Sequence, residues 1–208
     1  MAGPSPTGLG TRADVLAAAA ALFCTRGYTS SSTHAIAEAA GIRQASMYHH
    51  FPRKDDILLA LLLDTVQPSL EAAATLLAAE GPAADRLWAL CVADVRLLTA
   101  GPHNVGALYV LPEVSSPQFA PFRERRGELE TTYRTLVAAT GVPDIEVPLL
   151  TALVLGLVES VILQRRRGVE ITDDTAKAIA SAALRVLGVT PDAVAAARVA
   201  GNTLLRTL

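Results

Sequence analysis

The chain has 208 residues, which is long enough to bury a substantial hydrophobic core without disulfide bonds or a structural metal. It is rich in Ala, Leu and Val and poor in aromatic residues, a composition that favours packed helices. Its formal net charge is −2, so the protein as a whole is not an electrostatic binder of nucleic acid, and any affinity for phosphate has to come from a local patch.

The N-terminal segment predicts a short tail followed by a helix. Residues 1–10 are rich in Pro, Gly and small polar residues and lack the apolar core of a signal peptide, so we expect a disordered tail. Apolar residues then recur at helical spacing from near Thr11 until Gly27 ends the helix. Cys24 and Cys91 both lie in apolar helical patterns, which are typical of reduced core thiols rather than of a disulfide or a metal site.

Two short helices joined by a tight turn are predicted next. The Ser32 hydroxyl can cap the first helix, and Gly41 can end it because glycine adopts a positive φ at low cost. In the second helix, Met47 and Phe51 lie four residues apart and can both face the first, which leaves a polar outer face. This spacing is that of the helix-turn-helix, whose second helix can lie in a DNA major groove.

A series of short matches runs through roughly residues 12 to 60: Gly27-Tyr28, Ser31-Ser32, Ile36-Ala37, Ala40-Gly41-Ile42, Met47-Tyr48-His49-His50-Phe51 and Lys54-Asp55. Together they resemble the DNA-binding domain of the tetracycline-repressor (TetR) family. Two positions depart from the family pattern. Arg43 replaces a small hydroxyl residue that caps the recognition helix, which removes a capping contribution of about 1 kcal/mol. Ala45 replaces a frequent glycine; it can touch a thymine methyl group but cannot hydrogen-bond a base.

The resemblance implies roles for the polar side chains of this domain. Gln44 can pair bidentately with adenine. Tyr48 is expected to contact a base or a phosphate, with partly buried packing as the alternative. Other polar side chains are expected to touch phosphates and so fix the register on DNA: Thr33, His34, Arg43, Ser46, His49 and Lys54. Ile36, Met47 and Phe51 are assigned to the core alone.

The remaining chain predicts further helices separated by Gly and Pro. We expect Pro68 to kink or restart the connecting helix that begins at Lys54. The predicted segments are Lys54 to Leu63, Ser69 to Ala79, Ala83 to Ala100, a short helix from Val105 to Leu111, Phe119 to Thr140, Val147 to Leu163, Asp173 to Leu187 and Pro191 to Leu205.

The segment from Val147 to Leu163 is almost continuously apolar. It is short for a bilayer about 30 Å thick, so we expect a buried interface rather than a membrane span. Small residues at helical spacing leave room for another backbone to come close. In the resembled family, this helix and the one after it pair with their copies in a four-helix bundle, which implies a homodimer. The predicted interface residues are Ala152, Gly156, Ser160, Ile179 and Ala183.

The resemblance also implies an effector pocket enclosed by the C-terminal helices. The predicted lining is mainly apolar and suggests a hydrophobic or aromatic molecule, although the same residues would also make an ordinary core. This lining consists of Leu62, Trp88, Cys91, Val95, Tyr109, Phe119 and Phe122.

Catalytic patterns are weak in this sequence. It has no phosphate-cradling glycine loop, no nucleophile elbow and no His/Cys set at metal spacing. The neighbouring His49 and His50 point about 100° apart on a helix and do not readily share a metal. We therefore predict no enzymatic activity, no catalytic or metal site and no cofactor.

The sequence thus predicts an all-α protein with a tail at 1–10, a three-helix helix-turn-helix domain at 11–53 and a ligand-binding and dimerisation domain at 54–208. The expected function is that of a cytoplasmic TetR-like repressor, which binds a palindromic double-stranded DNA operator as a homodimer and is released by a small, hydrophobic effector. The alternative is a helical small-molecule binding or enzymatic protein in which the helix-turn-helix is only a packing unit.

Overall fold

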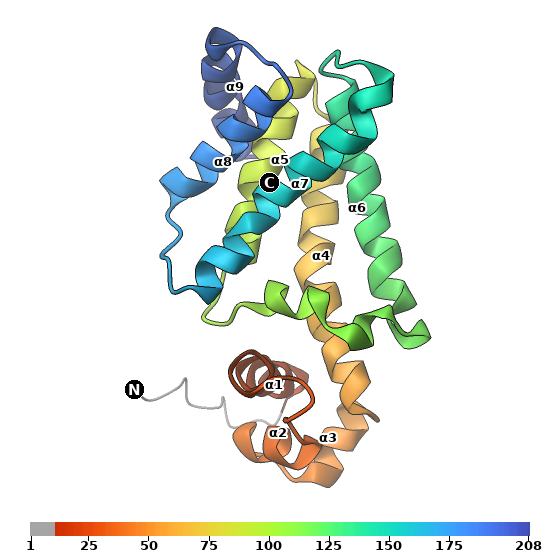
Figure 1. The fold of residues 1–208 in the computed structure, drawn as a ribbon. Helices are drawn as coiled ribbons and strands as arrows, with labels where there is room; N and C mark the ends of the chain where they lie inside the picture. Colours follow the sequence, from red (N-terminus) through yellow and green to blue (C-terminus); the bar gives the residue numbers. More distant parts are fainter. Residues whose placement is uncertain (1–10) are drawn as a thin grey trace. The chain divides into compact units, whose positions relative to one another are not determined.

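A computed structural model describes residues 11–208, so the tail predicted at residues 1–10 lies outside the described residues. The described chain consists of α-helices and short 3-10 helices joined by turns (Figure 1). The all-α class predicted from the sequence is confirmed. The α-helices are α1 (Arg12–Arg26), α2 (Thr33–Ala39), α3 (Gln44–His50), α4 (Lys54–Ala78), α5 (Ala83–Thr99), α6 (Ala120–Ala138), α7 (Val147–Arg166), α8 (Asp173–Val186) and α9 (Pro191–Leu204). The 3-10 helices are η1 (Val105–Val110), η2 (Pro112–Ser115), η3 (Pro117–Phe119) and η4 (Asp144–Glu146).

The chain divides into two compact units. The first comprises the described chain up to Asp64 together with Pro102–Phe122, and the second comprises Thr65–Gly101 and Arg123–Leu208. The segment 102–122, which carries η1 to η3, therefore belongs to the same unit as the three N-terminal helices.

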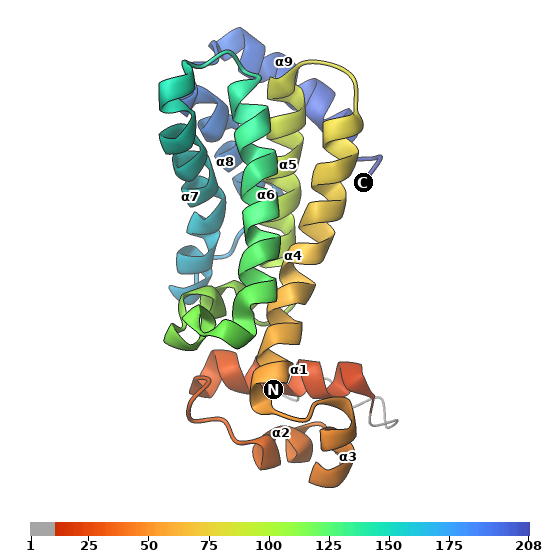
Figure 2. The ribbon, with the colours of Figure 1, turned by 90° about the vertical axis from the view of Figure 1, so that its right-hand side faces the viewer.

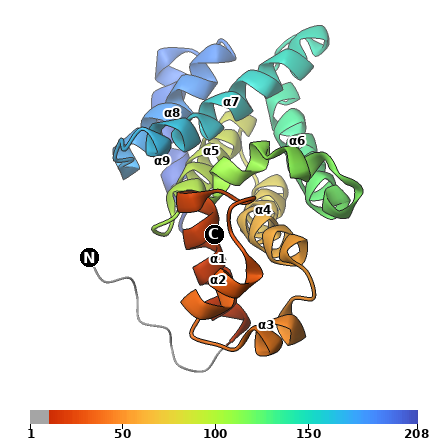
Figure 3. The same ribbon diagram turned by 60° about the horizontal axis from the view of Figure 1, so that its bottom comes forward.

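In the first unit, α1 begins at a reciprocal capping box. The Thr11 hydroxyl accepts from the backbone N–H of Asp14, and the Asp14 carboxylate accepts from the backbone N–H of Thr11. The buried stripe of α1 includes Val15, Ala19 and Phe23, which follow the helical spacing seen in the sequence. Figure 3 shows α1, α2 and α3 in this unit.

Helix α4 runs without interruption through Pro68, so the restart predicted there is wrong. A proline inside a helix removes one hydrogen bond and costs about 3 kcal/mol. Leu62 before the proline and Leu76 after it are fully buried, and burial of this kind on both sides offsets the loss.

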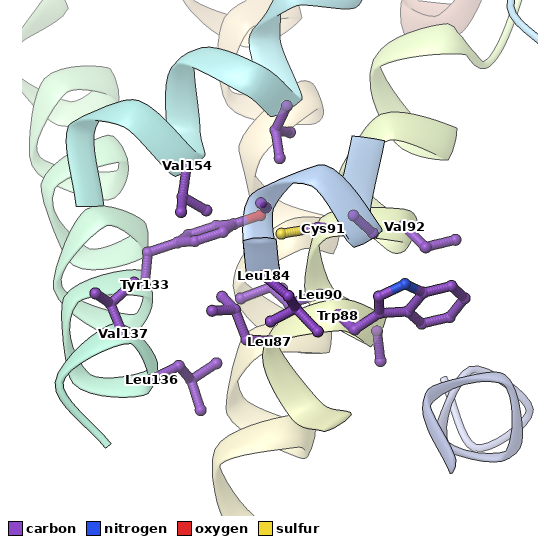
Figure 4. Packing of buried hydrophobic residues seen from close by; sticks show 14 of the residues in the cluster. Leu87, Trp88, Leu90, Cys91, Val92, Tyr133, Leu136, Val137, Val154 and Leu184 are labelled. Carbon is purple, nitrogen blue, oxygen red and sulfur yellow. The ribbon is translucent and has the colours of Figure 1, made fainter. Parts of the chain in front are cut away.

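The second unit is built around α5, which packs against α7, α8 and α9 (Figure 2). Its core cluster is large and mostly aliphatic, with Trp88 and Tyr133 as the largest side chains (Figure 4). The indole N–H of Trp88 donates to the Ser181 hydroxyl at 3.1 Å. Gly201 of α9 lies against the Trp88 ring, where a Cβ atom would come within 2.4 Å of a ring carbon. A glycine at this position therefore lets α9 approach the ring.

Within residues 11–208, two helical stretches, Lys54–Ala78 and Asp144–Arg166, have the length and hydropathy of a membrane span, a criterion that core helices of soluble proteins also meet. One face of α7 is buried in the core through Val154, Val158 and Val161. Its other face is apolar but exposed.

Candidate nucleic-acid interface

The helix-turn-helix is held by a small apolar core. Ile36 of α2, Met47 of α3 and Phe51 after α3 are all buried, as predicted. Gly41 has a φ of 70°, and this left-handed conformation permits the tight turn between the two helices. The turn and the core together orient α3 relative to α2.

The two short helices differ in how they begin. The Ser32 hydroxyl accepts from the backbone N–H of Ala35 at 3.1 Å and so caps α2, as predicted. Arg43 precedes α3 and makes no side-chain capping hydrogen bond. Helix α3 therefore begins without a side-chain cap, as predicted. The exposed Arg43 side chain is left available for a phosphate.

A polar cluster links the start of α2 to α3. The Gln44 amide donates to the Thr33 hydroxyl at 3.0 Å and to the Tyr48 hydroxyl at 3.2 Å. The Thr33 and Tyr48 hydroxyls are themselves 3.1 Å apart. These contacts hold the Gln44 side chain in one orientation. They use the amide donor group that a bidentate contact with adenine would also need.

The other candidates on and beside α3 are open to solvent. Tyr48 is 43% exposed, which agrees with the outward placement predicted for it. The exposed candidates are His34, Arg43, Ala45, Ser46 and His49. A DNA groove or backbone can therefore reach these side chains without rearrangement of the core.

Lys54 faces into its own domain. Its ammonium donates to the backbone carbonyls of Tyr28 and Ser31 at 3.0 and 3.1 Å and lies 4.1 Å from the centre of the Tyr28 ring. These contacts fasten the start of α4 to the segment between α1 and α2. Lys54 therefore has a positioning role, whereas the sequence analysis predicted only a phosphate contact for it.

Tyr28 is a positioning residue that the sequence reasoning did not single out. Its hydroxyl donates to the Asp55 carboxylate, and its ring packs edge-on against Phe23 with centroids 5.0 Å apart. Burial, followed by the hydrogen bond to Asp55, raises the pKa of Tyr28, so the phenol stays protonated. Tyr28 and Asp55 both lie in the short sequence motifs that resemble the TetR family. Their place in these motifs could have identified them.

The residues predicted to line an effector pocket divide between the two units. Leu62, Tyr109, Phe119 and Phe122 belong to the first, where the Tyr109 and Phe122 rings lie 5.3 Å apart. The others, Trp88, Cys91 and Val95, are fully buried in the core cluster of the second.

The predicted interface residues also divide by exposure. Ala152 and Gly156 are exposed on α7, while Ser160 and Ile179 are half-buried. Ala183 is fully buried in the core cluster, so it packs inside its own chain rather than on a surface. We therefore leave Ala183 out of the proposed interface.

Within residues 11–208 neither cysteine forms a disulfide; Cys91 is buried and Cys24 is half-buried. Among residues 11–208, no group of three or more His, Cys, Asp or Glu side chains is placed to hold a metal ion.

A polar, exposed second helix set on a buried helical core is the arrangement of helix-turn-helix DNA-binding proteins. Residues 15–61 match the family described as bacterial regulatory proteins, tetR family. The chain is also 48% identical to AmtR of Mycobacterium smegmatis, whose crystal structure it matches with a TM-score of 0.82 over 93% of this chain and 95% of that one. The chain therefore belongs to the tetR family and is a transcriptional regulator.

Other solved structures share the fold. The ketosteroid transcriptional regulator KstR2 of Mycobacterium tuberculosis is 24% identical, with a TM-score of 0.70 over 85% of this chain and 93% of that one. AibR, solved in complex with isovaleryl coenzyme A and operator DNA, is 20% identical, with a TM-score of 0.66 over 78% of this chain and 91% of that one. No curated protein sequence matches the chain.

Proposed function

We propose that this regulator is a repressor that binds a palindromic operator as a homodimer and leaves it when a small molecule binds. Residues 11–53 form the DNA-binding domain in this proposal, and residues 54–208 serve ligand binding and dimerisation. The observation that carries it is the exposed polar face of α3, held by a buried core and by the Thr33, Gln44 and Tyr48 cluster. Regulators of the family are soluble cytoplasmic proteins, and we extend that location to this chain.

DNA recognition is assigned to both exposed and tethered side chains of the helix-turn-helix. Tyr48, Ala45 and Gln44 face bases in this proposal, with Gln44 contributing its free amide oxygen as an acceptor. The remaining polar candidates contact phosphates: Thr33, His34, Arg43, Ser46 and His49. A further contact from Lys54 would use the donor that its two carbonyl partners leave over.

Dimerisation is assigned to the exposed face of α7 together with α8. Leu149, Leu153 and Leu163 are 64%, 47% and 57% exposed, so the single chain leaves a row of large apolar side chains in water. The exposed Ala152 and Gly156 lie on the same helix and let a second backbone come close. A second copy that covers this face would bring two recognition helices to one DNA molecule.

The test is to select bound sequences from a pool of random duplex DNA and to measure their affinity by mobility shift. We expect an inverted repeat whose half-sites lie about one helical turn, or a multiple of it, apart. Affinity should fall steeply with salt, since phosphate contacts release counterions. A pool that is not enriched, or binding that does not depend on sequence, would contradict the proposal.

The same experiment separates the alternative, a helical small-molecule binding or enzymatic protein whose helix-turn-helix is only a packing unit. Such a protein would show no retention even at low salt. Membership of the tetR family does not favour this alternative.

A further inference from the structure

Asp94 is a buried carboxylate that DNA binding does not use. It lies on α5 and is 5% exposed. One of its oxygens accepts from the Ser69 hydroxyl of α4, and the other accepts from the Tyr133 hydroxyl of α6 at 2.7 Å. Three helices of the second unit therefore converge on one acidic side chain.

No basic side chain of the described residues pairs directly with this carboxylate, although the nearby Arg126 favours its charged form. Within residues 11–208 it takes part in no ion pair, and the nearby Arg126 is held by Glu159 at 2.6 Å. Burial raises the pKa of Asp94 to about 6, because a surrounding of low polarity disfavours the charged form. A buried charge with only hydroxyl partners is costly, and positions of this kind often belong to binding sites.

The hydrogen-bonding capacity of Asp94 is also incomplete. A carboxylate has about four lone-pair positions, and the two hydroxyl donors occupy one on each oxygen. Tyr133 is itself buried, and Figure 4 shows its hydroxyl beside the sulfur of Cys91. The Tyr133 and Cys91 side chains therefore both lie inside the core. Asp94 can therefore accept further hydrogen bonds from a group that reaches it.

A cavity adjoins this carboxylate. Its volume is about 340 Å³, and its lining combines Asp94 with the apolar side chains of Pro68, Ala72, Ala93 and Leu97. Pockets for small organic molecules begin at about 300 Å³. The cavity thus has mainly apolar walls, with Asp94 and Ser69 among its lining residues, all within the second unit.

Arg96 also lines the cavity but does not neutralise Asp94. Its guanidinium pairs with Asp173 of α8 at 2.6 Å, and Asp173 also pairs with Lys177. Arg96 is therefore directed to Asp173, which leaves Asp94 without a direct ion-pair partner among the described residues.

We propose that this cavity binds a small organic ammonium compound, with its apolar body between α4 and α5 and its N–H groups donating to the Asp94 carboxylate. An ammonium supplies both the missing charge and the missing donors, whereas an anion would meet a buried carboxylate. Only the further statement that this compound acts as the effector rests on the proposed function. Binding itself does not require DNA.

The probe for this site is tryptamine, and tryptophol serves as its neutral counterpart of the same shape. Titration calorimetry on the full chain without DNA should show tryptamine binding at least about tenfold more tightly, because a charge-assisted hydrogen bond replaces a neutral one. Equal affinities, or no tryptamine binding at millimolar concentration, would overturn the proposal. Since DNA is absent, this result does not depend on whether an operator is found.

Two variants and a control locate the site. Asp94→Asn should weaken tryptamine binding by about tenfold or more and bring it close to the affinity for tryptophol. Asp192→Asn, which removes an equal charge from the exposed first turn of α9, should leave binding unchanged. If Asp94→Asn does not fold, Ala72→Leu decides the matter, because it fills the cavity and leaves the carboxylate in place. Unchanged tryptamine affinity in the folded Asp94→Asn variant or in Ala72→Leu would overturn the proposal.

Discussion

Some side chains in the helix-turn-helix hold the domain together and are also candidates for DNA contact. Tyr48 and Gln44 are partners within the domain and candidates for base contact, and Thr33 connects them. Lys54 and Tyr28 instead join the start of α4 to the segment before α2. Substitutions at Tyr48 and Lys54 are therefore expected to have different consequences.

Tyr48→Ala is expected to cost about 1 to 3 kcal/mol of operator binding while the fold is retained. The side chain is 43% exposed, so its removal opens no core cavity. Mobility shifts with the selected operator and with unrelated DNA would show whether the loss is specific. Normal operator binding by the variant would identify Tyr48 as packing.

Lys54→Ala is expected to lower the free energy of unfolding by about 1 to 3 kcal/mol, because two backbone carbonyls lose a charged donor. Arg53→Ala is the control. The neighbouring Arg53 forms an exposed ion pair with Asp56 at 3.0 Å, and pairs of this kind contribute little. Chemical denaturation would compare the two variants. Unchanged stability, together with a weaker dependence of DNA binding on salt, would instead identify Lys54 as a phosphate contact.

Asp94 predicts a pH dependence of stability. Burial raises its pKa from 3.8 to about 6 in the folded chain, and the nearby Glu159 adds to this increase. The hydrogen bonds from Ser69 and Tyr133 and the nearby Arg126 act in the opposite direction and lower the pKa. The folded state then binds a proton more tightly than the unfolded state, so stability falls as pH rises from about 4 to 6. Burial also raises the pKa values of Cys91 and Tyr133, so both stay neutral in this window.

The wild-type chain should gain on the order of 2 kcal/mol relative to Asp94→Asn when the pH is lowered from about 7 to 4. Chemical denaturation of both proteins across this range would measure the difference, which removes contributions from all other groups. Parallel profiles would mean that Asp94 does not titrate in the window.

At the scale of the elements, most helices begin and end where local signals place them. Ser32 and Thr172 cap α2 and α8 through their hydroxyls, and Pro148 stands in the first turn of α7. Helix α9 also begins at a local signal, the Thr190 cap, but its position depends on packing because Gly201 allows it to approach Trp88.

Gly201→Ala is expected to destabilise the chain by about 1 to 3 kcal/mol, since the added methyl group would lie 2.4 Å from a Trp88 ring carbon and 3.2 Å from the Asp85 carbonyl oxygen. Gly127→Ala on α6 is the matched control. It meets no atom within 4 Å and should be neutral or slightly stabilising because alanine favours a helix. Thermal denaturation would compare them. A stable Gly201→Ala variant would show that the Trp88 ring can move aside.

At the scale of the whole molecule, the exposed apolar face of α7 is the surface proposed to be covered by the second copy in the dimer. A Cβ at Gly156 would meet no atom within 4 Å in the single chain. A larger side chain at this position therefore leaves the protomer intact, and its effect reports on what covers α7.

Gly156→Leu is expected to weaken the dimer by about 1 to 3 kcal/mol through overpacking and to weaken operator binding with it. Gly127→Leu, an equally open glycine on α6, is the control and should remain dimeric. Light scattering and mobility shift on the same samples would decide this. A wild-type monomer, or a Gly156→Leu variant that is dimeric at every concentration and binds DNA normally, would place the interface elsewhere.

The sequence by itself determined the features that depend on neighbouring residues. The Ser32 cap, the positive φ at Gly41, the uncapped start of α3 and the buried pair Met47 and Phe51 follow from residues a few positions apart, where spacing and side-chain type decide the outcome. The same short motifs were enough to indicate the family. The helical class also followed, because apolar periodicity is a local property.

Only the tertiary structure decided which distant residues meet. Periodicity shows that a residue faces inward but does not name its partner, so neither the convergence of Ser69 and Tyr133 on Asp94 nor the inward turn of Lys54 was predicted. Packing also overrides local preference, which is why α4 continues through Pro68. Ala183 shared the pattern of an interface residue but lies inside the core, because only the arrangement of α8 against its neighbours determines which face remains exposed.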